Sequence, residues 1–201
     1  MKLYYAPNSR AVRIAWLLEE LEIPFEIEKF QLGQREMRAP EYLSVHPMGR
    51  VPALEDGAVS LFESGAIVQY ILARYGNGRL QPDIASPAYP QYLQWLHYAE
   101  GMIMPPMNAI VVETILLPPD RRSEVHAKRA TKLLGQMLFA VDHHMDGQQF
   151  LAGEFSAADV MTGHAVVMAD RLGADITDKP NLQSYIARLT QRPAFQKASN
   201  L

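Results

Sequence analysis

Residues 50–67 read RVPALEDGAVSLFESGAI, and this stretch decides the fold. Pro52 leads a short strand, residues 55–57 have the composition of a hairpin turn, and a second strand follows. Glu63 and Ser64 then precede an apolar run, which is typical of a helix N-terminus. The stretch therefore predicts a strand, a turn, a strand and a helix in immediate succession.

This hairpin and helix offer binding groups for a peptide. Proline has no amide hydrogen and holds the preceding residue extended, so we expect the amide and carbonyl of Val51 to stay free for an extended ligand. Ser64 is expected at the helix N-cap, where free amides and the helix dipole favour a carboxylate. The Glu63 carboxylate offers a partner for an ammonium group. The same residues also fit a simpler interpretation, a cis-Pro52 turn followed by an ordinary cap.

The residues before this stretch predict the rest of a small α/β domain. Strand patterns at residues 2–5 and 25–30 enclose a helical pattern at residues 10–21. The mostly polar residues 31–44 predict a loop and a short helix. Together with the hairpin and a helix over residues 64–75, the order is β-α-β-α-β-β-α with a proline before the third strand. This order is typical of a thioredoxin-like domain.

The remainder of the chain is predicted to be helical. A Gly-Asn-Gly run ends the preceding helix, and three prolines within residues 81–90 mark a boundary. We therefore expect a thioredoxin-like domain at residues 1–76, a linker at 77–88 and an all-α domain at 89–201.

Three local motifs stand out in the predicted all-α domain. Pro105-Pro106 is expected to kink or interrupt the first long helix. Ser156 with Asp159 three residues later is typical of a capping box that starts a buried helix. The adjacent pair His143-His144 does not predict a metal site, because neighbouring helical side chains point about 100° apart and no third ligand is evident.

Composition excludes several classes of function. The chain has 201 residues, 48% hydrophobic and 20% charged, which is ordinary for a globular protein. A net charge of −3 provides no basic surface for nucleic acid, and no apolar run reaches the roughly 18 to 20 residues that cross a membrane. The N-terminus enters a strand pattern directly, without the apolar core of a signal peptide, so we expect a cytoplasmic protein. There is no cysteine, so the protein has no thiol chemistry of its own.

The motifs together resemble a known family. The turn at residues 49–54 matches G-x-V-P-x-L, and the Glu63-Ser64 pair follows at a helix start, as in the glutathione-binding half of the cytosolic glutathione transferases. The helical half with its Ser156 box is similar as well, so the resemblance covers nearly the whole chain. Residues 9–21 look like the serine-type bacterial and fungal members. The resemblance implies that glutathione is a co-substrate whose thiol attacks a small hydrophobic electrophile.

The resemblance also implies a group that stabilises the glutathione thiolate near the first helix. Ser9 aligns with the catalytic serine of the serine-type members and ranks first. Asn8 ranks second, through its side-chain amide, and Tyr5 ranks third, if the turn is shaped as in the tyrosine-type members. The alternative for Ser9 is that it only caps the first helix.

The residues expected to bind glutathione include two arginines. Arg38 and Arg50 are candidates for the carboxylate at the glycine end, and each also fits a solvated surface arginine. Many relatives have arginine after the Glu-Ser pair, where this chain has Gly65, which removes one contact to the head group. The remaining candidates are those of the hairpin and the helix start: Val51, Pro52, Glu63 and Ser64.

The second substrate is expected against the first long helix of the all-α domain. Tyr98, Gly101 and Met104 are the candidates, and methionine makes adaptable apolar walls, although such residues are also common in plain cores. The family usually forms homodimers, so we expect one here. Two rival functions stay open: a glutathione-dependent peroxidase or dehalogenase, and a non-catalytic binding or regulatory module of the same architecture.

Overall fold

The computed structural model describes all residues, 1–201. The chain divides into two compact units, residues 1–82 with 191–201 and residues 83–190. The first unit contains the whole of the predicted α/β domain, residues 1–76. It also contains the C-terminal eleven residues, which the sequence analysis assigned to the all-α domain. The difference arises because the last helix packs against the first helix of the chain.

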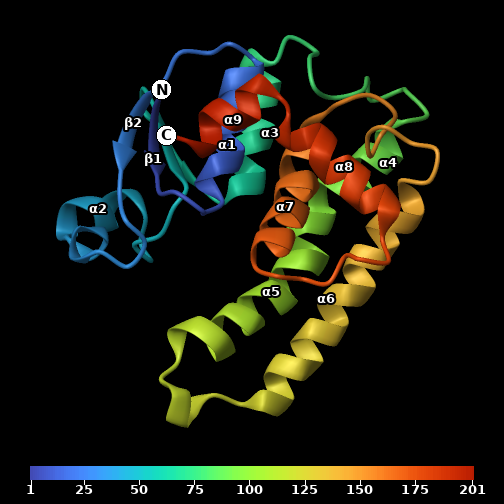
Figure 1. Cartoon of the computed structure of the whole chain (residues 1–201). Helices are drawn as coiled ribbons and strands as arrows, with labels where there is room; N and C mark the ends of the chain where they lie inside the picture. Colours follow the sequence, from blue (N-terminus) through green and yellow to red (C-terminus); the bar gives the residue numbers. More distant parts are fainter. The chain divides into compact units, whose positions relative to one another are not determined.

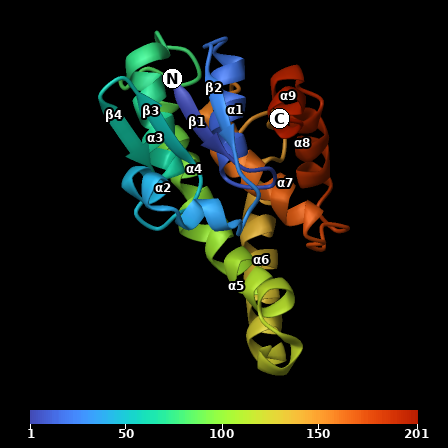
Figure 2. The same ribbon diagram turned by 90° about the vertical axis from the view of Figure 1, so that its left-hand side faces the viewer.

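The first unit is built on a four-stranded mixed sheet with the order β2-β1-β3-β4. Figure 2 shows the four strands side by side. Strand β1 pairs with β2 in parallel and with β3 antiparallel, so Leu3 faces both Ile27 and Leu54. The predicted strand and helix order is confirmed, and with it the thioredoxin-like fold. The elements are β1 (Lys2–Tyr5), α1 (Ala11–Glu20), β2 (Glu26–Lys29), η1 (Arg35–Arg38), α2 (Pro40–Val45), β3 (Ala53–Asp56), β4 (Val59–Phe62), α3 (Ser64–Tyr75) and α9 (Pro193–Ser199).

Alternating side chains of β1 contribute to cores on both faces of the sheet. Tyr4 packs with Phe30 and Tyr42, in a small cluster beneath η1 and α2. Tyr5 points to the opposite face and is completely buried. On that face α1 contacts both α3 and α9, and Figure 1 shows these three helices close together. The sheet is therefore covered on both sides.

Helix α9 belongs to the first unit because it packs along α1. Phe195 meets the Trp16 ring edge-on, with ring centroids 4.8 Å apart. The guanidinium of Arg192 donates to both carboxylate oxygens of Glu20 at 2.6 and 2.8 Å, and Trp16 Nε1 donates to the same carboxylate at 2.8 Å. Lys197 pairs with Glu19 at 2.7 Å. These contacts tie the C-terminus to the helix that follows β1.

We expect Glu20→Ala to lower the free energy of unfolding by about 1–2 kcal/mol, because it removes the bidentate, partly buried salt bridge with Arg192. Urea unfolding monitored by circular dichroism checks this value. Glu26→Ala is the matched control, since Glu26 is exposed on β2. Equal loss in the two variants would contradict a role for Glu20 in holding α9.

The second unit is all-helical, as predicted. Its elements are α4 (Tyr89–Tyr98), η2 (Ala99–Ile103), α5 (Met104–Val111), η3 (Val112–Leu116), η4 (Pro119–Arg121), α6 (Glu124–His144), η5 (Asp159–Gly163), α7 (His164–Arg171) and α8 (Pro180–Thr190). The predicted interruption near Pro105-Pro106 takes the form of a π-helical turn, η2, directly before them. Proline lacks an amide hydrogen, so Pro105 and Pro106 cannot donate to the carbonyls four residues earlier in the helix. Those carbonyls belong to the wider turn, η2.

The predicted capping box at Ser156 is built around a buried carboxylate. Asp159 is fully buried and accepts from the amide and hydroxyl of Ser156, at 2.9 and 3.2 Å. It also accepts from the amide of Leu151 at 3.0 Å and from the hydroxyl of Tyr185 on α8 at 2.8 Å. Asp159 therefore joins the loop before η5, the helix start and α8.

Candidate active site

The turn between β1 and α1 presents Asn8 and Ser9. Asn8 is exposed and has a φ of 57°, in the left-handed region that asparagine tolerates better than most residues. Ser9 Oγ donates to the carbonyl of Ala6 at 2.6 Å and accepts from the amide of Ala11 at 3.1 Å. The N-cap of α1 is Arg10, so Ser9 lies one residue before the cap. Its hydroxyl therefore sits at the positive end of a ten-residue helix.

Tyr5 faces away from this turn, into the contact with α9. Its hydroxyl donates to the carbonyl of Ala198 at 2.9 Å, and burial raises the pKa of the phenol. The hydroxyl is thus already used as a donor inside the first unit. Ser9 is also a donor to a carbonyl, but Tyr5 is fully buried whereas Ser9 is half-buried and Asn8 is exposed, and this difference favours Ser9 and Asn8 over Tyr5.

Val51 and Pro52 form the predicted turn before β3. The peptide bond between them is cis, and β3 begins only at Ala53, so Val51 lies outside the ladder. Pro52 is buried and Val51 is half-buried. The hydroxyl of Tyr42 donates to the carbonyl of Arg50, which fixes the chain just before the turn. The backbone of Val51 therefore lies two residues before Ala53, the first paired residue of β3.

Glu63 and Ser64 differ in detail from the prediction. The N-cap of α3 is Glu63, and Ser64 is the first helical residue, so the expected Ser64 cap is wrong by one position. Glu63 has a φ of 76°, a conformation that costs a non-glycine residue of order 1–3 kcal/mol and often marks functional sites. Its side chain is exposed. Residues 64–66 keep amides without a helical acceptor, as at every helix start.

Arg13 is a candidate site residue that the sequence analysis missed. It lies on α1, four residues after Ser9, and is completely buried. Its Nη1 donates to Ser64 Oγ at 3.2 Å, and Ser64 is itself only 3% exposed. A charged side chain is rarely buried without partners. An arginine on the apolar face of the first helix was the signal that could have pointed to this pair.

The two candidate arginines of the site lie on the surface. Arg38 is exposed, and its Nη1 donates to the carbonyl of Met48 at 2.8 Å. Arg50 is exposed as well. His46, which was not foreseen from the sequence, lies between them in the chain. It is buried and packs against Phe62 with tilted rings, their centroids 4.8 Å apart. Burial lowers the pKa of His46 and the charge of Arg50 lowers it further, whereas a backbone hydrogen bond and Glu63 oppose the change.

The candidates for the second substrate lie in the second unit, around η2. Tyr98 donates its hydroxyl to the carbonyl of Met137 at 3.0 Å, so the ring packs toward α6. Met104 is a core residue, 8% exposed, and Gly101 is exposed. Of the three, Gly101 is the most exposed, and Tyr98 is half-buried.

No cluster of three or more His, Cys, Asp or Glu side chains has the proximity needed to hold a metal ion. The two adjacent histidines make separate contacts. His143 stacks on Phe139, whereas His144 lies 2.9 Å from the carbonyl of Leu151 and packs on Trp95. None of the helices combines the length and apolar character required to span a bilayer.

Comparison with known proteins gives a consistent picture. The family profile "Glutathione S-transferase, N-terminal domain" matches residues 1–73. Glutathione S-transferase 3 of Zea mays is 32% identical over 98% of this chain and 92% of its own length. Glutathione S-transferase GstB of Escherichia coli is 30% identical over 94% of this chain and 92% of its own. A glutathione transferase from Pseudomonas putida, crystallised with one glutathione disulfide per subunit, matches with a TM-score of 0.90 at 26% identity, covering 100% of this chain and 90% of that one.

The chain thus consists of a thioredoxin-like unit and an all-helical unit. The thioredoxin-like unit contains the candidate site residues: Ser9 in the turn before α1, Val51 and Pro52 before β3, and Glu63 and Ser64 at the start of α3. The two relatives are similar to this chain in sequence over 92% of their own length. The chain belongs to the glutathione S-transferase family.

Proposed function

We propose that this protein binds glutathione and transfers it to an electrophilic second substrate, with Ser9 stabilising the thiolate. The observation that carries the proposal is the buried hydrogen bond from Arg13 to Ser64, which links the helix that follows Ser9 to the Glu63-Ser64 helix start. The hydrogen-bond donor proposed for the glutathione sulfur and the groups proposed to bind its amino-acid head group therefore lie in the same unit.

Ser64 is proposed to bind the carboxylate of the glutamyl head group. Arg13 donates to Ser64 Oγ, so the serine hydrogen is free to point outward and donate to a ligand. The amides at the start of α3 and the buried guanidinium charge add attraction for an anion. The exposed carboxylate of Glu63, on the adjacent residue, supplies the complementary partner for the ammonium group.

The backbone of Val51, beside Pro52, is proposed to pair with the extended middle of glutathione. Arg38 and Arg50 are proposed for the carboxylate at the glycine end, since both are exposed near this turn in the chain. Arg38 is already oriented by its bond to Met48, which reduces the freedom lost on binding.

Thiol activation requires a modest change in free energy. A free thiol has a pKa of about 8.5, and lowering it by one unit needs about 1.4 kcal/mol of preferential stabilisation of the anion. Ser9 contributes a hydroxyl donor at the N-terminus of α1, once a thiolate displaces the carbonyl of Ala6 as its acceptor. Asn8, exposed in the same turn, is the second candidate, and Tyr5 is the third.

Calorimetric titration with glutathione and with S-methylglutathione tests the proposal, together with the ultraviolet absorbance of the thiolate across pH. We expect both ligands to bind and the bound thiol to titrate below its value in water. A bound thiol that titrates as in water would refute thiolate stabilisation, and absence of binding would favour the non-catalytic module. A panel of aryl halides, hydroperoxides, isothiocyanates and epoxides then identifies the electrophile and separates conjugation from peroxidase or dehalogenase activity.

We expect Ser64→Ala to weaken S-methylglutathione binding about tenfold, because a hydrogen bond to a charged group contributes about 1.5 kcal/mol or more. Calorimetry measures the change. Ser60→Ala is the matched control, because Ser60 is exposed on β4 of the same hairpin. Unchanged affinity in Ser64→Ala would remove Ser64 from the proposed site.

We further propose that the protein is a homodimer in the cytoplasm. Each unit has large apolar side chains on its surface: Met48 and Phe62 in the first, and Met102 and Phe139 in the second. Burying such residues against a second copy would be favourable. A reducing compartment keeps the glutathione thiol free. Light scattering of the purified protein measures the oligomeric state, and a monomer at micromolar concentration would contradict the dimer.

A further inference from the structure

The second unit contains a pocket that the proposed transferase site does not use. It lies between α5, α6 and the end of α7 and has a volume of about 150 Å³. Its lining includes none of Tyr98, Gly101 and Met104, the candidates for the electrophile site. The walls are mainly apolar: Met107, Ile110, Leu134, Leu138, Ala169 and Leu172.

The size and lining of the pocket indicate the class of ligand. An apolar cavity of about 150 Å³ is large enough to bind one benzene ring. The polar side chains of the lining are Thr131 and Asp175. Thr131 donates its hydroxyl to the carbonyl of Ala127, so its oxygen is left as an acceptor toward a ligand. A ring with a neutral donor group therefore fits these walls.

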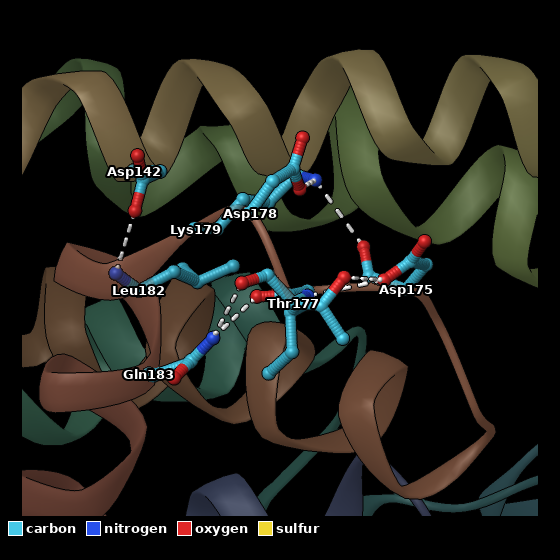
Figure 3. A network of polar contacts seen from close by, with 8 residues as sticks. Asp142, Asp175, Thr177, Asp178, Lys179, Leu182 and Gln183 are labelled. Atoms are coloured by element: carbon cyan, nitrogen blue, oxygen red, sulfur yellow. Dashed lines mark hydrogen bonds and ion pairs between the residues drawn. The ribbon is translucent and has the colours of Figure 1, made fainter.

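The groups around Asp175 in the pocket lining disfavour anions. Asp175 Oδ1 accepts from the amide and hydroxyl of Thr177, at 3.0 and 2.7 Å, and these bonds lower the pKa of Asp175 (Figure 3). The nearby ammonium of Lys179 is paired with Asp178 and donates to the Asp175 carbonyl at 3.2 Å. The amides of Gly173 and Ala174 are donated to carbonyls of residues 169–170. A carboxylate would therefore meet a fixed negative charge and few free donors.

We propose that this pocket binds small, uncharged, single-ring aromatic molecules such as phenols, at a site separate from the transferase site. The ring occupies the apolar walls, and its hydroxyl points toward the polar side chains of the lining, Thr131 and Asp175. This selectivity is opposite to that of the Ser64 site, which is proposed to attract a carboxylate. The pocket therefore provides a second place for a ligand on the same chain.

Gly135 provides a direct test, because it lies on α6 in the pocket wall and an added Cβ would meet no atom within 4 Å. Gly135→Leu fills the pocket without a backbone clash, and Gly135→Ala fills it partly. Both also replace glycine by a better helix former, so the fold is expected to persist. Gln136→Leu is the matched control, since Gln136 is the next residue of α6 and is exposed.

Phenol and benzoate are the probes, titrated into ¹⁵N-labelled protein and followed by amide chemical shifts. We expect phenol to bind with a dissociation constant on the order of 1 mM, with shifts in residues 107–175, and benzoate to bind at least tenfold more weakly. Gly135→Leu should weaken phenol at least tenfold, Gly135→Ala less, and Gln136→Leu not at all. Asp175→Asn should reduce the preference for phenol over benzoate about two- to fivefold.

Saturating S-methylglutathione serves as the competitor. Unchanged phenol affinity in its presence supports a separate site, whether or not the transferase proposal holds. Phenol shifts centred on Ser9 and Ser64, displacement by S-methylglutathione, or equal binding to wild type and Gly135→Leu would overturn the proposal.

Discussion

Asp159→Ala should lower the free energy of unfolding of the second unit by about 3–5 kcal/mol, because four donors lose one buried acceptor at once. The amide of Leu151, the amide and hydroxyl of Ser156, and the hydroxyl of Tyr185 all bond to this carboxylate. Truncation leaves them buried without that partner. The loop before η5, the start of the buried helix and α8 would then lose their common contact.

Amide hydrogen exchange measures this loss locally, with urea unfolding as the global measure. We expect protection to fall in η5, α7 and α8. Asp159→Asn should lose less, because its side-chain oxygen still accepts. Asp146→Ala is the matched control, since Asp146 is exposed after α6. A loss below about 1 kcal/mol in Asp159→Ala would show that the carboxylate does not organise this region.

Much of the first unit could be predicted because its local signals agree with one another. Pro52, the turn at residues 55–57 and the alternating strand patterns each favour the element that the structure contains. Ser64 shows the limit of such rules. Serine is a preferred cap, but Glu63, with its positive φ, takes the N-cap position instead, so the helix begins one residue earlier than expected, at Ser64. That conformation is uncommon for glutamate and has no sequence signal.

Contacts between distant segments could not be predicted from periodicity. The pattern at residues 193–199 indicates a helix, but its place on α1 depends on Arg192 and Glu20, which are 172 residues apart in sequence. Tyr98 gives a second case, because helical spacing identifies its face but not its partner, Met137 on α6. Arg13 gives a third, since its acceptor, Ser64, lies 51 residues later. Such partners follow from tertiary packing.

Ser9→Ala is expected to lower kcat about 10- to 100-fold while changing the affinity for S-methylglutathione less than twofold. The hydroxyl is proposed to act on the thiolate, which S-methylglutathione lacks. Losing one to two units of thiol pKa depression corresponds to about 1.4–2.7 kcal/mol, which gives this range of rate. The pKa of bound glutathione should rise toward about 8.5, its value for a free thiol.

Steady-state rates with a chosen aryl halide and the thiolate absorbance of bound glutathione provide the two readouts. Ser9 Oγ also accepts from the amide of Ala11, so Ser9→Thr tests whether a retained hydroxyl restores the thiol pKa. Asn8→Ala is the neighbouring comparison, because Asn8 is exposed in the same turn. If Ser9→Ala turns over normally while Asn8→Ala is impaired, the thiolate donor is the Asn8 amide. If both are normal, Tyr5 becomes the leading candidate, and its hydroxyl would have to exchange its bond to the Ala198 carbonyl for one to the sulfur.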